Sequence, residues 1–103
     1  MPKYLSLWEM DDSKMPTAPD ERAAVMTKMI ALTKQYLKDN PGGEWGAFIG
    51  ENKGYGIGGK TPQDIIKLTF MFAPYVKFKT YQTVSIDEVE EVFKAMMAQM
   101  PPK

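Results

Sequence analysis

The order in which the hydrophobic pattern changes its period constrains the fold of this chain more than any single motif does. Apolar residues alternate with period two, as in half-buried strands, over residues 4–10, 45–49, 55–58 and 76–84. They recur at helical spacing over residues 20–38, 62–73 and 86–100. The order β-α-β-β-α-β plus a last helix predicts one ferredoxin-like α+β domain over residues 1–103. Its four-stranded antiparallel sheet carries both crossover helices on one face.

Short polar residues, proline and glycine mark the expected ends of the helices. Thr17 and Asp20 form a candidate cap for the first helix, which Asn40-Pro41-Gly42-Gly43 stops. The run Thr61-Pro62-Gln63-Asp64 has a threonine cap, proline at the first helical position and an acid in the first turn. Ser85-Ile86-Asp87-Glu88 is a capping box. These signals predict three separate helices.

The chain contains neither cysteine nor histidine, and 13 basic residues balance 13 acidic ones. Thiolate and imidazole catalysis, structural zinc and His-ligated haem are therefore excluded, and we expect no metal site and no cofactor. Zero net charge provides no field that attracts phosphate polymers or anionic membranes, which disfavours nucleic acid as a partner. The first twenty residues hold three aspartates and no long apolar run. This predicts a cytoplasmic protein without membrane contact.

Residues 54–61, Gly54-Tyr55-Gly56-Ile57-Gly58-Gly59-Lys60-Thr61, match the phosphate-loop pattern G-x-x-x-x-G-K-[ST]. Their surroundings disagree with that function. The four preceding residues have the composition of a turn, where the motif requires the end of a buried strand. Pro62 also disfavours the helical conformation that Thr61 has in such a loop. Nucleotide binding through this segment is kept only as a minor alternative.

Read from Lys53, the same segment matches the start of the RNA-recognition signature, K-G-[FY]-[GA]. RNA-recognition domains share the predicted order of elements, and Tyr55 and Ile57 are expected beside Tyr4 on the face opposite the helices. The signature then fails, because Ile57 and Lys60 replace aromatic residues. Single-stranded RNA is therefore a second minor alternative.

A purely structural interpretation accounts for every glycine of the segment. Gly54 completes a hairpin turn, and Gly59 lets the chain leave the sheet. Gly56 and Gly58 lie on the helix-facing side of a central strand, where glycine usually means that a helix or another backbone comes close. We therefore expect a closely packed helix above them, and a ligand against bare backbone is the alternative to test.

The two sides of the first strand lead to a prediction about partners. We expect the crossover helices to cover the side of Leu5 and Leu7. The open face would then display Tyr4, Ser6, Trp8, Met10, Tyr55 and Ile57, with some of Phe48, Phe78 and Tyr81. An apolar patch of this size marks an interface or a groove, and we expect a second copy to cover it as a homodimer. The last helix, with the stripe Val89, Val92, Phe93, Met96, Met97 and Met100, would fold over an edge or dock on the partner.

Two stretches of the chain carry a resemblance to a known group. They are Trp45-Gly46-Ala47-Phe48-Ile49-Gly50-Glu51 with Gly54-Tyr55-Gly56, and Val76-Lys77-Phe78 with Thr83-Val84-Ser85-Ile86-Asp87-Glu88-Val89. The chain resembles small archaeal and bacterial proteins of the dimeric α+β barrel superfamily. The resemblance implies two ferredoxin-like sheets paired in a barrel, in some members with a cavity between sheet and helices. Its enzymes include cofactor-free monooxygenases, lactone isomerases and haem proteins, many using a histidine that this chain lacks, so no catalytic residue carries over.

Two functions from different classes stay open. The first is a dimeric small-ligand-binding or regulatory module, with a pocket or dimer face formed by Tyr4, Ser6, Trp8, Phe48, Tyr55 and Tyr81. The second is a cofactor-free, monooxygenase- or isomerase-like enzyme acting on a small aromatic or carbonyl compound. It would use a tyrosine and a carboxylate such as Glu9 or Glu51 as acid and base. The sequence identifies neither a ligand nor a reaction.

Overall fold

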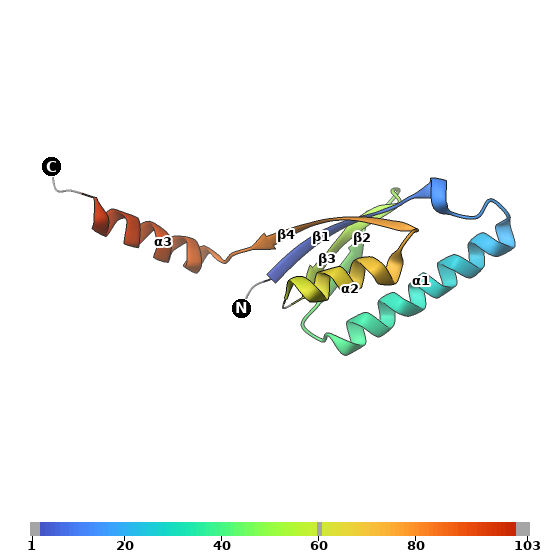
Figure 1. Cartoon of the computed structure of the whole chain (residues 1–103), viewed down its shortest axis with the longest axis horizontal. Coiled ribbons are helices and arrows are strands. Elements are labelled where there is room, and N and C mark those ends of the chain that lie inside the picture. Colours follow the sequence, from blue (N-terminus) through green and yellow to red (C-terminus); the bar gives the residue numbers. More distant parts are fainter. Residues whose placement is uncertain (1–2, 60, 101–103) are drawn as a thin grey trace.

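The computed structural model describes residues 3–59 and 61–100 (Figure 1). One antiparallel sheet, in the order β2-β3-β1-β4, is formed by β1 (Lys3–Met10), β2 (Glu44–Ala47), β3 (Lys53–Gly58) and β4 (Val76–Thr83). The helices are α1 (Pro19–Asp39), α2 (Pro62–Phe72) and α3 (Ile86–Gln99), with a short 3₁₀ turn η1 (Asp12–Lys14) after β1. The predicted order of elements is confirmed, and the glycine segment supplies the central strand β3, which begins two residues earlier than expected.

The cap of α2 forms as the sequence predicts, and at α3 one half of the predicted capping box is present. At α2 the Thr61 hydroxyl accepts from the backbone N–H of Asp64, and the Asp64 carboxylate accepts from the backbone N–H of Thr61. At α3 the Ser85 hydroxyl accepts from the backbone N–H of Glu88. Each contact satisfies first-turn amides that have no partner inside their own helix.

The start of α1 differs from the prediction. Its N-cap is Ala18, which provides no side-chain cap, and Pro19 takes the first helical position. The expectation that Thr17 and Asp20 cap this helix was wrong. Because Pro19 has a backbone angle preset for the first turn, it fixes the helix start two residues after Thr17.

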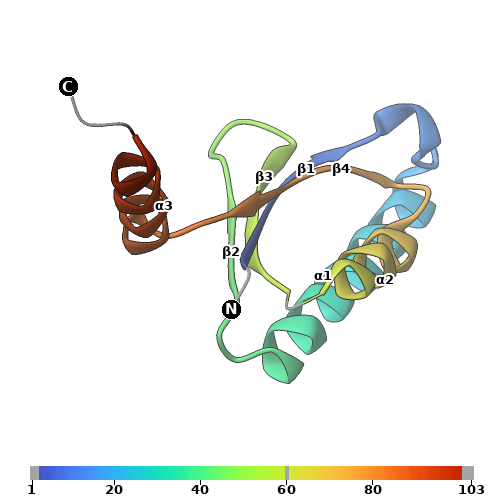
Figure 2. The same cartoon turned by 60° about the vertical axis from the view of Figure 1, so that its left-hand side comes forward.

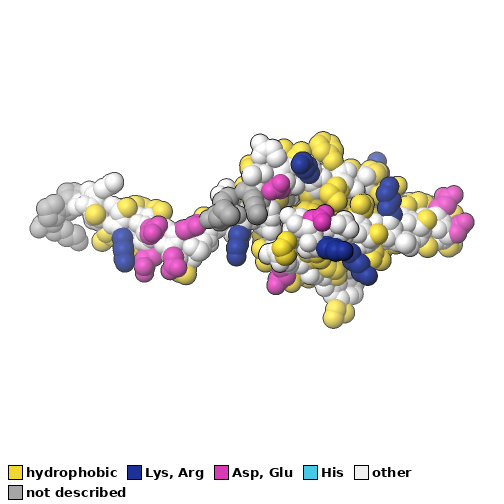
Figure 3. Space-filling view, turned by 90° about the horizontal axis from the view of Figure 1, so that it is seen from below, with side chains coloured by type: hydrophobic (Ala, Val, Ile, Leu, Met, Phe, Trp, Pro, Cys, Tyr) yellow, Lys and Arg dark blue, Asp and Glu magenta, His cyan; other side chains and the backbone are white. Residues whose placement is uncertain are grey.

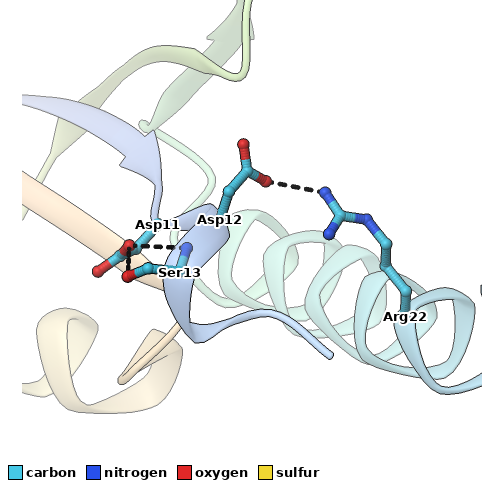
Figure 4. A network of polar contacts seen from close by, with 4 residues as sticks. All are labelled: Asp11, Asp12, Ser13 and Arg22. Carbon is cyan, nitrogen blue, oxygen red and sulfur yellow. Dashed lines mark hydrogen bonds and ion pairs between the residues drawn. The ribbon is translucent and has the colours of Figure 1, made fainter. Parts of the chain in front are cut away.

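A polar network fixes the connection between β1 and α1 (Figure 4). The Ser13 hydroxyl donates to Asp11 Oδ1 over 2.6 Å, and Arg22 Nη2 of α1 donates to Asp12 Oδ1 over 2.8 Å. The hydroxyl of Ser13 and the ammonium of Lys77 hold the pKa of Asp11 below its usual value. The ends of β1, α1 and β4 are thereby tied together.

Helices α1 and α2 lie on the same face of the sheet (Figure 2), but that face is not the one predicted. Trp8 lies opposite Gly54 on β3 and Phe78 on β4, and all three belong to the helix-facing side. Tyr4, Ser6, Trp8 and Met10 therefore face the helices, while Leu5 and Leu7 lie on the open face. The prediction had the two sides of the first strand reversed, whereas its placement of Tyr55 and Ile57 on the open face was correct.

The charges explain the observed choice of face. The strand register places all the charged side chains of the three long strands with Leu5 and Leu7: Lys3, Glu9, Lys53, Lys77 and Lys79. Burying these charges under the apolar sides of α1 and α2 would be costly, so the crossover helices pack on the other side. In the first strand alone, both sides hold apolar residues. That strand by itself therefore does not show which side the helices cover.

The hydrophobic core is small for a chain of this length. The buried apolar side chains among the described residues are Tyr4, Met15, Met29 and Phe72, and Phe72 packs against Phe78 with ring centroids 6.1 Å apart. The accessible surface is 8100 Å², where a compact monomer of 11.7 kDa has about 5,900 Å². The radius of gyration is 18.5 Å, against about 13 Å for a compact chain of this size.

Much of this excess comes from α3. The helix extends away from the body beyond the end of the sheet (Figures 1 and 2), and all of its residues are exposed. The structure thus consists of a sheet with two helices on one face and an arm, α3, whose residues are all exposed.

Candidate ligand cavity and exposed apolar faces

A cavity of about 560 Å³ separates the sheet from α1 and α2. Its sheet side is formed by Ser6, Trp8, Trp45, Gly56 and Phe78, and its helix side by Met29, Ile30, Tyr36, Ile65 and Leu68. Ile30 is still 52% exposed, which shows that α1 does not close against the strands. The space lies where a tightly packed protein of this topology would have the centre of its core.

Two parallel indoles form an aromatic wall of this cavity. The rings of Trp8 and Trp45 stack with centroids 5.4 Å apart and planes 7° from parallel. The Trp8 ring also covers Gly54, where an added Cβ would approach its Cζ2 atom to 2.6 Å and collide with the Gly46 carbonyl oxygen. Gly54 is therefore required by the indole that lies on it, and the position of Trp8 is fixed from both sides.

The Trp8 indole nitrogen Nε1 is buried and has no hydrogen-bond partner among the described residues. An indole N–H is only a donor, so no rearrangement of its own atoms removes the need for an acceptor. Leaving such a donor unpaired in an apolar environment costs about 1–3 kcal/mol. Among the described residues that line the cavity, Trp8 is thus the one with a buried side-chain donor that lacks a hydrogen-bond acceptor.

The cavity is also bordered by four exposed polar side chains, Lys34, Glu44, Glu51 and Asn52. The less exposed polar groups near it are neutral hydroxyls. The Ser6 hydroxyl lies 3.0 Å from the hydroxyl of Thr80, and Ser6 is 5% exposed. The Thr33 hydroxyl donates to the carbonyl of Met29. Burial, and to a smaller extent the carboxylate of Asp64, raises the pKa of Tyr36. The phenol stays protonated at neutral pH, so these groups offer hydrogen bonds and no charge.

The glycines of β3 have different surroundings, and one prediction about them was wrong. At Gly58 a Cβ would lie 3.6 Å from Gly43 Cα, so another backbone does come close. At Gly56 the nearest atom to an added Cβ is the Glu44 carbonyl oxygen at 3.8 Å, and no helix packs there. Gly56 lines the cavity instead, because α1 stands off from the sheet at this point.

The predicted site residues are divided between the two faces. Ser6 and Trp8 line the cavity, and Tyr4 is buried on the same face. Tyr55 and Tyr81 lie on the open face with Leu5 and Leu7, and Phe48 stacks on Tyr55 with centroids 6.2 Å apart. Only two of the six side chains therefore meet at one cavity.

The sequence-based set missed Trp45 and all the cavity residues of the two helices. A signal for Trp45 existed: it alternates in phase with Ala47, and the register sets it opposite Gly56. In the sequence, the helix residues cannot be distinguished from ordinary core residues. Their helical spacing indicates which side of the helix faces the sheet, but it does not indicate the distance between helix and sheet.

The open face combines apolar side chains with lysines. Leu5, Leu7, Tyr55, Ile57 and Tyr81 form its apolar part, with Lys3, Lys53, Lys77 and Lys79 around them. Leu7 is 37% and Tyr81 53% exposed. A hydrogen bond to the Glu44 carboxylate, together with its negative charge, raises the pKa of Tyr55. Glu9 lies on this face and does not line the cavity, whereas Glu51 is exposed at the edge of the cavity.

Helix α3 presents a second uncovered apolar surface. Its stripe consists of Val89, Val92, Phe93, Met96, Met97 and Met100, each between 48% and 63% exposed. The helix also carries four carboxylates and one lysine, visible along the arm in Figure 3 as magenta and dark blue side chains beside the hydrophobic ones. In the described part of the chain this is the most acidic element.

Comparison with protein-family models, with curated proteins and with solved structures found no match, so no family is assigned. Within residues 3–59 and 61–100, no cluster of acidic side chains is suited to holding a metal ion. None of the described helices has the length and hydrophobicity needed to cross a bilayer. The structural features themselves therefore carry the functional argument.

Proposed function

We propose that this protein is a small-molecule-binding module. Its cavity between the sheet and helices α1 and α2 would take a flat, largely apolar compound that carries a hydrogen-bond acceptor. The observation that carries the proposal is the buried indole N–H of Trp8, which has no partner in the described structure and belongs to the cavity wall. An acceptor on a ligand would remove the cost of leaving this donor unpaired.

The shape and size of the cavity support a flat ligand. Its volume of about 560 Å³ lies in the range of small-molecule sites, about 300–1,000 Å³. The stacked indoles of Trp8 and Trp45 provide a planar aromatic wall, and Gly56 exposes bare backbone beside it. A planar ring system can lie against such a surface, where a branched ligand would lose contact.

The polar groups of the cavity favour binding over catalysis. Ser6 and Tyr36 offer neutral hydrogen bonds, and the raised pKa of Tyr36 opposes its use as a base near neutral pH. Glu9 lies on the opposite face of the sheet. Glu51 and Glu44 do border the cavity, but both are exposed to water. Because the cofactor-free enzyme needs an acid or base held beside a buried substrate, it has less support than a binding module.

We also propose that the open face pairs two copies of the chain. The support is its apolar surface and the large accessible area of the single chain, which exceeds the compact value by more than the roughly 800 Å² per partner of a standard interface. The strand order β2-β3-β1-β4 with both crossover helices on one face is compatible with the ferredoxin-like half of an α+β barrel.

The ligand proposal is tested with two probes of similar shape, 2-naphthol and naphthalene, of which only the first has an oxygen acceptor. The chain has two tryptophans, so nitrogen-15 spectra contain two indole N–H signals, and Trp45→Phe assigns the Trp8 signal. We expect 2-naphthol to move the Trp8 signal strongly and naphthalene to move it less. If neither compound at millimolar concentration changes the Trp8 signal, the proposal is wrong.

A cavity-filling substitution gives the matched control. Gly56→Leu places a side chain toward the cavity, where the Cβ meets only the Glu44 carbonyl oxygen at an ordinary contact distance of 3.8 Å. It should weaken 2-naphthol binding at least tenfold while leaving the protein folded. Gly42→Leu adds the same side chain at a position with no neighbouring atom within 4 Å, away from the cavity lining. It should bind 2-naphthol as the unchanged protein does. Equal affinity of the two variants would place the ligand elsewhere.

A further inference from the structure

We infer that the open sheet face is covered by helix α3 of a second copy of the chain, and that two copies exchange these arms reciprocally. The inference rests on the pairing of copies proposed above and identifies the element that makes the contact. The same chain carries two uncovered apolar surfaces: the open face around Leu5, Leu7 and Tyr81, and the stripe of α3 around Val92 and Met96. Each needs a cover of complementary shape.

Charge distinguishes between the possible covers. The open face has four lysines, Lys3, Lys53, Lys77 and Lys79, and only two acids. Helix α3 has Asp87, Glu88, Glu90 and Glu91 against Lys94 alone. Glu88 borders the apolar groove that Val89, Val92 and Phe93 form. A basic apolar sheet and an acidic apolar helix are therefore complementary both in hydrophobicity and in sign of charge.

Two open faces packed against each other lack this complementarity. A twofold sheet-on-sheet contact brings the same four lysines of both copies to one interface, which adds like-charge repulsion and the loss of their hydration. It also leaves the apolar stripe of α3 in water. Exchange of the arms covers both surfaces on both copies with one symmetric contact.

The connection between β4 and α3 favours exchange over folding back. Only Val84 and Ser85 separate Thr83 from Ile86, and Ser85 has an extended backbone with φ −77° and ψ 164°. In that conformation its hydroxyl caps α3 through the Glu88 amide. The helix is thereby directed beyond the end of the sheet and away from α1 and α2 (Figure 2). Returning to its own sheet would require a reversal at these two residues.

Single cysteines give a direct test, because the chain has none of its own. A Leu7→Cys chain is mixed with a Val92→Cys chain and treated with a short bismaleimide. We expect the mixed crosslinked dimer as the main product, since the two positions lie on the open face and on the α3 stripe. A Leu7–Leu7 product from the first chain alone would mean that sheets pair directly. That result would refute the role of α3 but keep the dimer.

The remaining outcomes are separated with a chain that carries both cysteines. An intramolecular crosslink in a protein that sediments as a monomer would mean that α3 folds back on its own sheet, which refutes the exchange and the dimer together. A monomer that binds a fluorescent oligouridine, with binding lost on Tyr55→Ala, would assign the open face to RNA and refute the exchange as well.

Surface charge provides an independent readout by sedimentation of the full chain. Val92→Asp should raise the dimer dissociation constant at least a hundredfold, because it buries a carboxylate in the contact. Ala98→Asp adds the same charge on the opposite side of α3 and should leave association nearly unchanged. Lys79→Glu should weaken the dimer, and Glu88→Lys in the same chain should restore part of the loss. If Lys79→Glu strengthens association, the lysines face each other and the inference fails.

Discussion

The two faces of the sheet are built from the same four strands and differ in almost every property. The helix-facing side carries Ser6, Trp8 and Phe78 together with three glycines of β3, and none of the charged residues of the long strands. The open side carries leucines and tyrosines surrounded by lysines. The first side leaves a cavity and the second leaves an uncovered surface, so both are incomplete in a single copy.

This difference shows that an unfilled cavity and an uncovered sheet face need different kinds of binding partner. The cavity is lined mainly by apolar and neutral groups, with exposed charged side chains only at its edge. It holds one donor without a partner among the described residues, which a small molecule can satisfy. The open face is wide, half-exposed and charged at its borders, which a macromolecular surface can cover and a small molecule cannot.

Removing a ring from the helix-facing side should cost far more than removing one from the open face. Phe72→Ala deletes a buried ring that packs on Phe78, and we expect a loss of about 3 kcal/mol of unfolding free energy. Tyr81→Ala, at a half-exposed position, should cost less than about 1 kcal/mol in dilute solution. Urea denaturation measures both. Equal losses would mean that the two faces are equally covered in the folded chain.

Two glycines on the same strand should respond in opposite ways to the same change. Gly54→Ala forces a Cβ against the Trp8 ring and the Gly46 carbonyl, and should cost about 1–3 kcal/mol. Gly56→Ala brings its Cβ only into ordinary contact with the Glu44 carbonyl oxygen, at 3.8 Å. It should be neutral or slightly stabilising, because alanine restricts the unfolded chain. Thermal unfolding of the two variants compares them directly. A large loss at Gly56 would show that the cavity closes in solution.

Two threonines of β4 provide a smaller contrast. Thr80→Val removes the hydrogen-bond partner of buried Ser6, which should cost about 1 kcal/mol. Thr83→Val removes an exposed and longer hydrogen bond to the Lys3 carbonyl, 3.3 Å, and should change the stability by less than about 0.5 kcal/mol. Denaturant midpoints give both values, and the reverse order would contradict the assignment of faces.

The smallest effect concerns the pH dependence of two tyrosines. The pKa of Tyr55 is raised by Glu44 and that of Tyr36 mainly by burial. Because both folded-state pKa values lie above the ordinary value of 10.0, both groups stabilise the fold below that pH. This contribution is lost as the pH rises through the raised values. Glu44→Gln should return the pKa of Tyr55 toward normal and leave that of Tyr36 raised, as tyrosinate absorbance can measure.

Local chemistry carried much of the prediction from sequence. The capping run at Thr61 and the Ser85 cap formed as expected, because they depend on neighbours three residues away. Period-two stretches became strands, and the glycine segment became central strand β3 rather than a loop. At Thr17 a local rule failed for a local reason, since Pro19 set the helix start.

The candidate site was predicted less well, because its residues come from elements far apart in the sequence. Trp8 and Ser6 were named, but they were grouped with Tyr55 and Tyr81 on one face. The register sets Tyr55 opposite Leu7 and Tyr81 opposite Leu5, on the other side of the sheet. Alternate residues of a strand lie on opposite faces, so an error of one position exchanges the two faces completely. Only the pairing of several strands reveals which face carries the charged side chains.

The amino-acid sequence by itself determined the elements, their order and the ends of two helices, because these follow from periodicity and from contacts within a few residues. The tertiary structure decided which face the helices cover, the space above Gly56, the unpaired Trp8 donor and the isolation of α3. Those features depend on distances between strands and helices that no local pattern contains. They also direct the functional argument toward a ligand on one face and a second copy on the other.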